Sequence, residues 1–225
     1  MKAGYSLILA PIVLVAVFCL PAAKRAQAVP IAGSATGLSA PEHTVSFSEV
    51  SLAEPTPIAG AFLAYGVSFD NLFYDTNYSG IFGNMSGPDA RNWTNDQFNR
   101  GTTHIYFTAP VSDAAFALVT GSGLTLFTSY LHGNPVESFS AAAPTTPGNL
   151  NDFFGFANSF FDEIAISVTP TNPQNSAVFD NVQFNTAIPE PASIALFGWA
   201  ALVGLMKGRR QTRGSPAMRK FVYPS

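Results

Sequence analysis

The side chains best suited to binding chemistry are concentrated between Tyr74 and Arg100, a segment rich in aromatic, amide and carboxylate groups. A pyranose offers an apolar face for ring stacking and hydroxyl groups for hydrogen bonds, so rings beside amides and carboxylates favour sugar binding. The alternative is a long surface loop held by its own Asx turns and buried rings. The residues expected to contact carbohydrate are Tyr78, Asn92, Trp93 and Asp96.

Calcium is a second chemistry that these oxygen-bearing side chains would support, because hard cations take carboxylate and carbonyl ligands. The acids do not have the spacing of an EF-hand loop, and solvated surface charge is the alternative. No other cofactor is expected. The sequence leaves a bound calcium open, with candidate ligands Asp70, Asp75, Asp89 and Asp180.

Recognisable catalytic patterns are absent from the sequence. It contains no nucleophile elbow, zinc-protease helix, Walker loop or dinucleotide fingerprint. His43, His104 and His132 are scattered without a second histidine at ligand spacing, which favours strand or turn positions over metal ligation. A glycosidase pair such as Asp89 with Asp96 stays open, because the separation of two carboxylates is spatial. We expect a protein that is not an enzyme.

Charge is segregated along the chain. Residues 29–187 carry two basic and thirteen acidic side chains, a net charge of −11, whereas the tail from Lys207 has six basic side chains and no acidic one. An acidic domain of this kind binds polyanions poorly, which argues against nucleic acid as a partner.

The single cysteine, Cys19, lies in the N-terminal apolar run, so the exported chain would have neither thiol nor disulfide.

The central part, residues 29–187, has the pattern of an all-β domain. Short runs with period-two alternation are separated by glycine, proline and asparagine, and no long amphipathic helical pattern interrupts them. Gly121, Ser122 and Gly123 resemble a hairpin turn between two of the runs. Seven or more short strands predict an antiparallel β-sandwich with a jelly-roll-like topology. The expected strands are His43–Val50, Phe62–Phe69, His104–Thr108, Ala114–Thr120, Gly123–Tyr130, Glu163–Thr169 and Ala177–Phe184.

The N-terminus has the parts of a secretory signal peptide. Lys2 precedes an apolar run that ends at Leu20, and Ala26 and Ala28 supply the small residues that signal peptidase accepts. We therefore expect residues 1–28 to be removed on export. The alternative, a retained signal anchor, is disfavoured because the apolar run is short for a bilayer span.

The C-terminus contains an apolar stretch followed by basic residues. As a helix, residues 192–206 would span about 22 Å, less than a hydrocarbon core of roughly 30 Å, so local thinning or snorkelling by Lys207 is required. The basic residues after the stretch predict a cytoplasmic tail, residues 211–225. We expect one transmembrane helix that holds the β domain outside the membrane.

Around this stretch the chain contains, in order, Pro189, Glu190, Pro191, the apolar residues, Arg209 and Arg210. Behind a signal peptide, this order resembles the PEP-CTERM sorting signal of bacterial surface proteins over residues 188–210. The resemblance implies recognition near Pro-Glu-Pro and processing by the membrane enzyme exosortase, in bacteria that make exopolysaccharide. The tail is longer than is usual in that family. A plain tail-anchored single-pass protein is the alternative.

Together these patterns predict a non-enzymatic exported protein of the bacterial cell surface or extracellular matrix, associated with exopolysaccharide. Its precursor would be membrane-anchored, with signal peptidase and an exosortase-like enzyme as partners. The rival functions are a surface-displayed polysaccharide hydrolase and a calcium-dependent carbohydrate-binding adhesion module. The predicted parts are a signal peptide (1–28), a β-sandwich (29–187), a sorting signal (188–210) with a transmembrane helix (192–206), and a basic tail (211–225).

Overall fold

The structure is a computed structural model that describes residues 28–94, 101–121, 123–168 and 176–187. Within these ranges the chain is almost wholly β-structure, with one short 3-10 helix, η1 (Leu63–Tyr65). The strands pair antiparallel, which confirms the predicted all-β class. The strands are β1 (Val29–Ser34), β2 (His43–Val45), β3 (Val67–Asp70), β4 (Phe73–Asp75), β5 (Asp89–Arg91), β6 (Thr103–Thr120), β7 (Thr125–Leu131), β8 (Asn134–Ala141), β9 (Phe153–Ala157), β10 (Phe161–Val168) and β11 (Ala177–Thr186).

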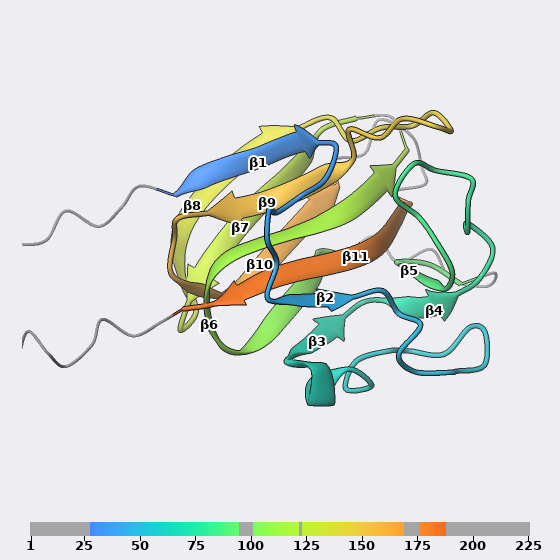
Figure 1. The fold of residues 1–225 in the computed structure, drawn as a ribbon, viewed down its shortest axis with the longest axis horizontal. Helices are drawn as coiled ribbons and strands as arrows, with labels where there is room; N and C mark the ends of the chain where they lie inside the picture. Colours follow the sequence, from blue (N-terminus) through green and yellow to red (C-terminus); the bar gives the residue numbers. More distant parts are fainter. Residues whose placement is uncertain (1–27, 95–100, 122, 169–175, 188–225) are drawn as a thin grey trace, which may run out of the picture.

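The long strand β6 belongs to both layers of a sandwich-like arrangement (Figure 1). Its first half pairs with β3 and β10, and beyond β10 lie β7 and β8. Its second half pairs with β9 and β11, which are extended by β1 on one side and by β5 and β4 on the other. Pro110 lies between the halves, where the ladder to β10 shifts register. Proline has no N–H for the ladder, so such a bend is a favourable place for it.

The core between the layers is built mainly of phenylalanine. Phe116 of β6 packs against Phe127 and Phe179 with ring centroids 6.1 and 5.9 Å apart. Phe127 in turn stacks on Phe154 at 5.2 Å. These four rings are fully or almost fully buried. Strand alternation sends the neighbours of Phe116 to the opposite face, so β6 and β11 also present an outer face that the core does not use.

Most predicted strands are in the right places, but four details are wrong. The segment expected as one strand, Phe62–Phe69, begins with the 3-10 helix η1, and extended backbone starts only at β3 (Val67–Asp70). His104–Thr108 and Ala114–Thr120 are two parts of one 18-residue strand, β6. The glycines at 121 and 123 do not close a hairpin between paired strands, because β7 pairs with β8 and β10 and not with β6. The strand expected from His43 is only three residues long, because Phe47 adopts a left-handed φ of 59° that is incompatible with extended backbone.

Both described ends of the chain lie at the same end of the sandwich, where β1 begins and β11 finishes (Figure 1). Residues 1–27 and 188–225 lie outside the described residues, and with them Ala26 of the signal, the Pro-Glu-Pro motif, the expected span and Arg209 and Arg210. Ala28, the last residue of the expected signal, is buried next to β1. Among the described residues, none of the helical structure has the length and hydrophobicity needed to cross a bilayer.

Candidate functional site

A row of three carboxylates crosses the outer face of β4, β5 and β11. Asp75 lies directly opposite Asp89 in the β4–β5 ladder, and the register of β5 with β11 brings Asp180 opposite Asp89 on the other side. Adjacent strands lie about 4.8 Å apart, so the three side chains stand next to one another. All three are fully buried. Because like charges in direct register destabilise a sheet, this row needs compensation.

The connection between β4 and β5, residues 76–88, covers the row and supplies part of that compensation from its backbone. Asp75 accepts the N–H groups of the next two residues at 2.7 and 3.0 Å. Asp89 accepts the N–H of Tyr78 through Oδ2 at 3.2 Å. The other oxygen of Asp89, Oδ1, is buried and has no hydrogen-bond partner in the described part of the chain.

Two more buried acids hold the second half of the same connection. Asp180 accepts the N–H of Ser86 at 2.8 Å. Asp152, just before β9, accepts the backbone N–H and the side-chain amide of Asn84 at 3.2 and 2.6 Å. The side chain of Asn181 donates to the Asn84 carbonyl at 2.6 Å. Four buried carboxyl groups therefore hold the 76–88 connection in place, because they accept hydrogen bonds from its N–H groups.

Positive charge reaches only one end of the row. Arg91 is the single lysine or arginine among the described residues. Its Nε lies 2.9 Å from Oδ2 of Asp75, and a terminal nitrogen lies 3.3 Å from Oε1 of Glu54. Burial, together with the charge of Asp75, raises the pKa of Asp89 to about 7, and burial raises the pKa of Asp180 to about 8. Near neutral pH these two acids are therefore at least partly protonated.

The fixed connection carries two aromatic rings that, with Trp93, line a hollow of about 270 Å³ on this outer face. Tyr78 stacks on Phe82 with centroids 6.2 Å apart and meets Trp93 edge-on at 5.8 Å. The guanidinium of Arg91 lies 5.5 Å from the centre of the Trp93 ring. The three rings are half-buried, so each keeps an accessible surface. Aliphatic and hydroxyl groups complete the lining, from Val119, Thr120, Ser176 and Val178.

Two of the four residues expected to contact carbohydrate line the hollow. The structure brings Tyr78 and Trp93 together in the hollow. Asn92 is only 2% exposed, and its Oδ1 accepts the N–H of Ala177 at 2.8 Å. It joins β5 to the start of β11 and does not line the hollow, which corrects its expected role as a sugar contact. Asp96 lies outside the described residues.

The four expected calcium ligands do not form one site. Asp70 is exposed at the end of β3 and accepts the N–H of Asn71 at 2.9 Å. Asp75 forms an ion pair with Arg91, and both oxygens of Asp180 accept hydrogen bonds from N–H groups. Across the described ranges, no three His, Cys, Asp or Glu side chains are arranged to hold a metal ion. Asp89, one acid of the glycosidase pair left open by the sequence, is fully buried, and its expected partner Asp96 lies outside the described residues.

Sequence reasoning gives Arg91 and Asp152 no role in this region. Arg91 had a usable signal, since it is one of only two basic residues between positions 29 and 187 and therefore the natural partner for a buried acid. Asp152 had none, because its partner Asn84 is 68 positions away along the chain.

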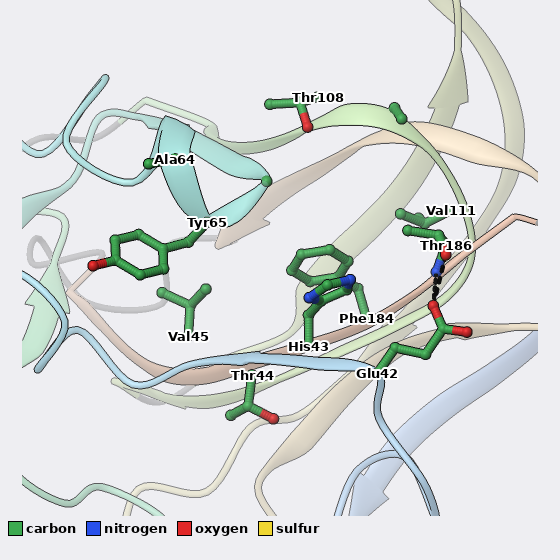
Figure 2. A pocket seen from close by; sticks show the side chains of 12 residues that line it. Glu42, His43, Thr44, Val45, Ala64, Tyr65, Thr108, Val111, Phe184 and Thr186 are labelled. Carbon is green, nitrogen blue, oxygen red and sulfur yellow. Dashed lines mark hydrogen bonds between the residues drawn. The ribbon is translucent and has the colours of Figure 1, made fainter.

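A second, larger hollow of about 540 Å³ is shown in Figure 2. The rings of His43 and Phe184 stack in its centre with centroids 4.8 Å apart and an interplanar angle of 24°. Tyr65 stands on one side with 41% of its surface exposed. On the other side Glu42 accepts the N–H and the hydroxyl of Thr186 at 2.8 and 2.6 Å. These bonds lower the pKa of Glu42, so its carboxylate is charged at neutral pH.

Comparisons with known proteins do not assign a family. No family model matches the chain, and no curated protein matches it. Among solved structures, a DUF4465 family protein from Bacteroides caccae is similar over 71% of this chain and 100% of its own, with 8% identity and a TM-score of 0.36. A similarity at that level carries no argument about this protein.

Proposed function

We propose that this protein is a non-enzymatic exported surface protein whose β domain binds a polysaccharide of the extracellular matrix in the hollow lined by Tyr78, Phe82 and Trp93. The observation that carries the proposal is the hollow itself: three half-buried rings held at fixed angles beside threonine and serine hydroxyls. Flat apolar surface next to hydroxyl groups matches the two sides of a sugar ring. The buried carboxyl groups beneath keep this platform pre-organised, which reduces the entropy lost on binding.

The charge of the domain selects the class of polysaccharide. Residues 29–187 carry a net charge of −11, and the one arginine that the structure describes is engaged by Asp75 and Glu54. A uronic or sulfated polymer would be repelled by this charge and would find no free guanidinium or ammonium among the residues that the structure describes. The ligand is therefore a neutral or amino-bearing glycan.

The sorting signal supplies the location in this proposal. The chain leaves the sandwich at Ala187, at the end of β11, whereas the aromatic hollow lies at the start of the same strand. The start and the finish of β11 lie at opposite ends of the domain (Figure 1), so a tether that begins at Ala187 would hold the domain by the end remote from Ser176 and Val178 of the hollow. Display by a PEP-CTERM-like signal is thus compatible with polysaccharide binding.

The glycan part is tested with the full chain in detergent and three tetrasaccharides: cellotetraose, tetrameric glucosamine and tetragalacturonic acid. Isothermal titration calorimetry should detect binding of one or both of the first two and none of the third. Trp93→Ala should weaken binding at this hollow about tenfold, the loss of one stacking ring. Phe160→Ala is the matched control, because Phe160 is 47% exposed and lies outside the hollow. Equal affinities for the two variants would contradict the proposal.

The sorting part is tested by mass spectrometry of the C-terminus in the native host, with and without exosortase. A mature end near Pro191 only when exosortase is present is the expected result. An intact Ser225 in both strains would mean a permanent anchor and would overturn processing.

A further inference from the structure

We propose that the hollow in Figure 2 is a second glycan-binding site, so that one β domain holds two polysaccharide segments at once. The inference rests on the proposed function, since it takes the same class of ligand. The inference goes beyond the proposed function because a domain with two sites would cross-link segments of the matrix.

The chemistry of the hollow is that of a sugar site built from different residues. His43 covers Phe184 as a nearly parallel stack, which leaves the outer face of an exposed imidazole as a flat platform. Tyr65 adds an exposed phenol ring at the side. Threonine hydroxyls at positions 108 and 186 lie beside the platform, and the Glu42 carboxylate accepts hydrogen bonds. Hydroxyl or amino groups of a glycan are suited to these acceptors.

The walls of the hollow are held in place by close packing. Tyr65 closes η1, and Gly66 after it takes a left-handed φ of 86°. A Cβ at Gly66 would lie 3.1 Å from Cζ of Phe184, so only glycine lets the backbone approach this ring without displacement. The Gly66 carbonyl also accepts the N–H of Thr108 at 3.0 Å, which ties η1 to β6. The distance between Tyr65 and the imidazole stack is therefore set by backbone contacts.

The two hollows are too far apart to share one sugar unit. Val178 lines the first and Phe184 the second, and the separation of six positions along β11 corresponds to about 20 Å of extended strand. The side chains also face different sides of the strand, because Val178 belongs to the outer cluster and Phe184 to the core. Two ligands can be held simultaneously, and a polymer that reaches both gains avidity.

The test is the number of tetrasaccharides bound per chain, measured by native mass spectrometry on the detergent-released full chain. The probe is whichever of cellotetraose and tetrameric glucosamine binds. The sugar concentration is set near the Kd of the unmodified protein, so that a hollow weakened about tenfold is mostly empty. Under that condition we expect up to two bound molecules for the unmodified protein, up to one for the double variant His43→Ala/Tyr65→Ala, up to one for Trp93→Ala, and almost none when all three changes are combined. Tyr106→Ala is the matched control, because Tyr106 is also an exposed ring stacked on a histidine, at 5.6 Å from His104.

The outcomes separate the two proposals. One molecule per chain that is lost with Trp93→Ala and unaffected by the double variant would overturn the second site and leave the proposed function standing. One molecule that depends only on His43 and Tyr65 would overturn the first hollow instead. Binding of neither tetrasaccharide would overturn both. Circular dichroism of each variant shows whether a lost site reflects a lost fold.

Discussion

The inner and outer faces of β6 and β11 are stabilised by different means, although the same strands form both. Phe116 and Phe179 point inward into a dry cluster of rings. On the outer side of the same strands lie Ala117, Val178 and Asp180, and the covering layer is an irregular connection rather than a sheet. The inner face depends on apolar area, whereas the outer face depends on hydrogen bonds that N–H groups donate to four carboxyl groups.

This difference bears on the proposed binding surface, which lies on the outer face. A phenylalanine core is non-directional and tolerates local adjustment, so it provides the frame. The outer face uses directional bonds to place Tyr78 and Phe82 beside Trp93, at the cost of burying acids that prefer water. The frame should therefore determine whether the protein folds, and the carboxyl groups should determine whether the aromatic hollow is assembled.

The largest effect is expected from a cavity in the inner face. Phe116→Ala removes a fully buried ring that contacts Phe127 and Phe179, and should lower the free energy of unfolding by about 3–5 kcal/mol. Urea unfolding followed by circular dichroism measures it. Phe160→Ala, an exposed ring lost from the same protein, should change the free energy by less than about 0.5 kcal/mol. Similar costs for both would show that the core assignment is wrong.

A smaller effect, with a different signature, is expected from the outer face. Asp180→Ala leaves the N–H groups of Ser86 and Asn181 without their acceptors and should cost about 1–3 kcal/mol. The near-ultraviolet circular dichroism of Tyr78 and Trp93 should change as well, because the connection loses its hold. Asp180→Asn keeps one acceptor oxygen and should restore most of both signals. If Asp180→Ala left the aromatic spectrum intact, the carboxyl groups would not be what positions the hollow.

The next effect in size is the pH dependence of stability, which should come from the buried acids of the outer face. Burial raises the pKa of Asp89 to about 7 and that of Asp180 to about 8, whereas an unfolded aspartate ionises near 4. Folding therefore favours the protonated forms, and their stabilisation is complete below about pH 4 and lost as the pH rises through 7 and 8. We expect the Tm to fall by several degrees between pH 5 and pH 9. Asp180→Asn should flatten this fall, and an unchanged slope in that variant would count against the buried pair.

The smallest effect is expected from calcium. Asp75 is paired with Arg91, Asp180 has both oxygens engaged by N–H groups, and no three acids converge in the described part of the chain. Addition of 5 mM calcium or of a chelator should move the Tm by less than about 1 °C. A rise of several degrees with calcium, abolished by Asp89→Asn, would instead identify the unpartnered Oδ1 of Asp89 as a ligand.

The sequence predicts the inner face better than the outer one. Alternating apolar residues in β10 indicate which side chains point to the core, because strand periodicity is a local property. In β11 the same alternation is misleading, because a register shift between Asp180 and Gln183 puts Val178 on the outer face and Phe184 in the core. The carboxylate row depends on the register of three strands that are far apart in sequence, so Asp75, Asp89 and Asp180 are visible only as separate acids. Composition shows that the segment Tyr74–Arg100 is enriched in aromatic, amide and carboxylate side chains. It gave no means of telling Trp93, which lines the hollow, from Asn92, which is buried beside it.

The central claim is that Trp93 stands in a glycan-binding hollow, and fluorescence tests it most directly. The chain has two tryptophans, so Trp199→Phe leaves Trp93 as the only tryptophan, which is excited selectively at a wavelength that tyrosine does not absorb. Titration of that variant with cellotetraose or tetrameric glucosamine should give a saturable change in emission, absent with tetragalacturonic acid. A flat emission with all three sugars, from a protein whose circular dichroism shows it to be folded, would contradict the claim.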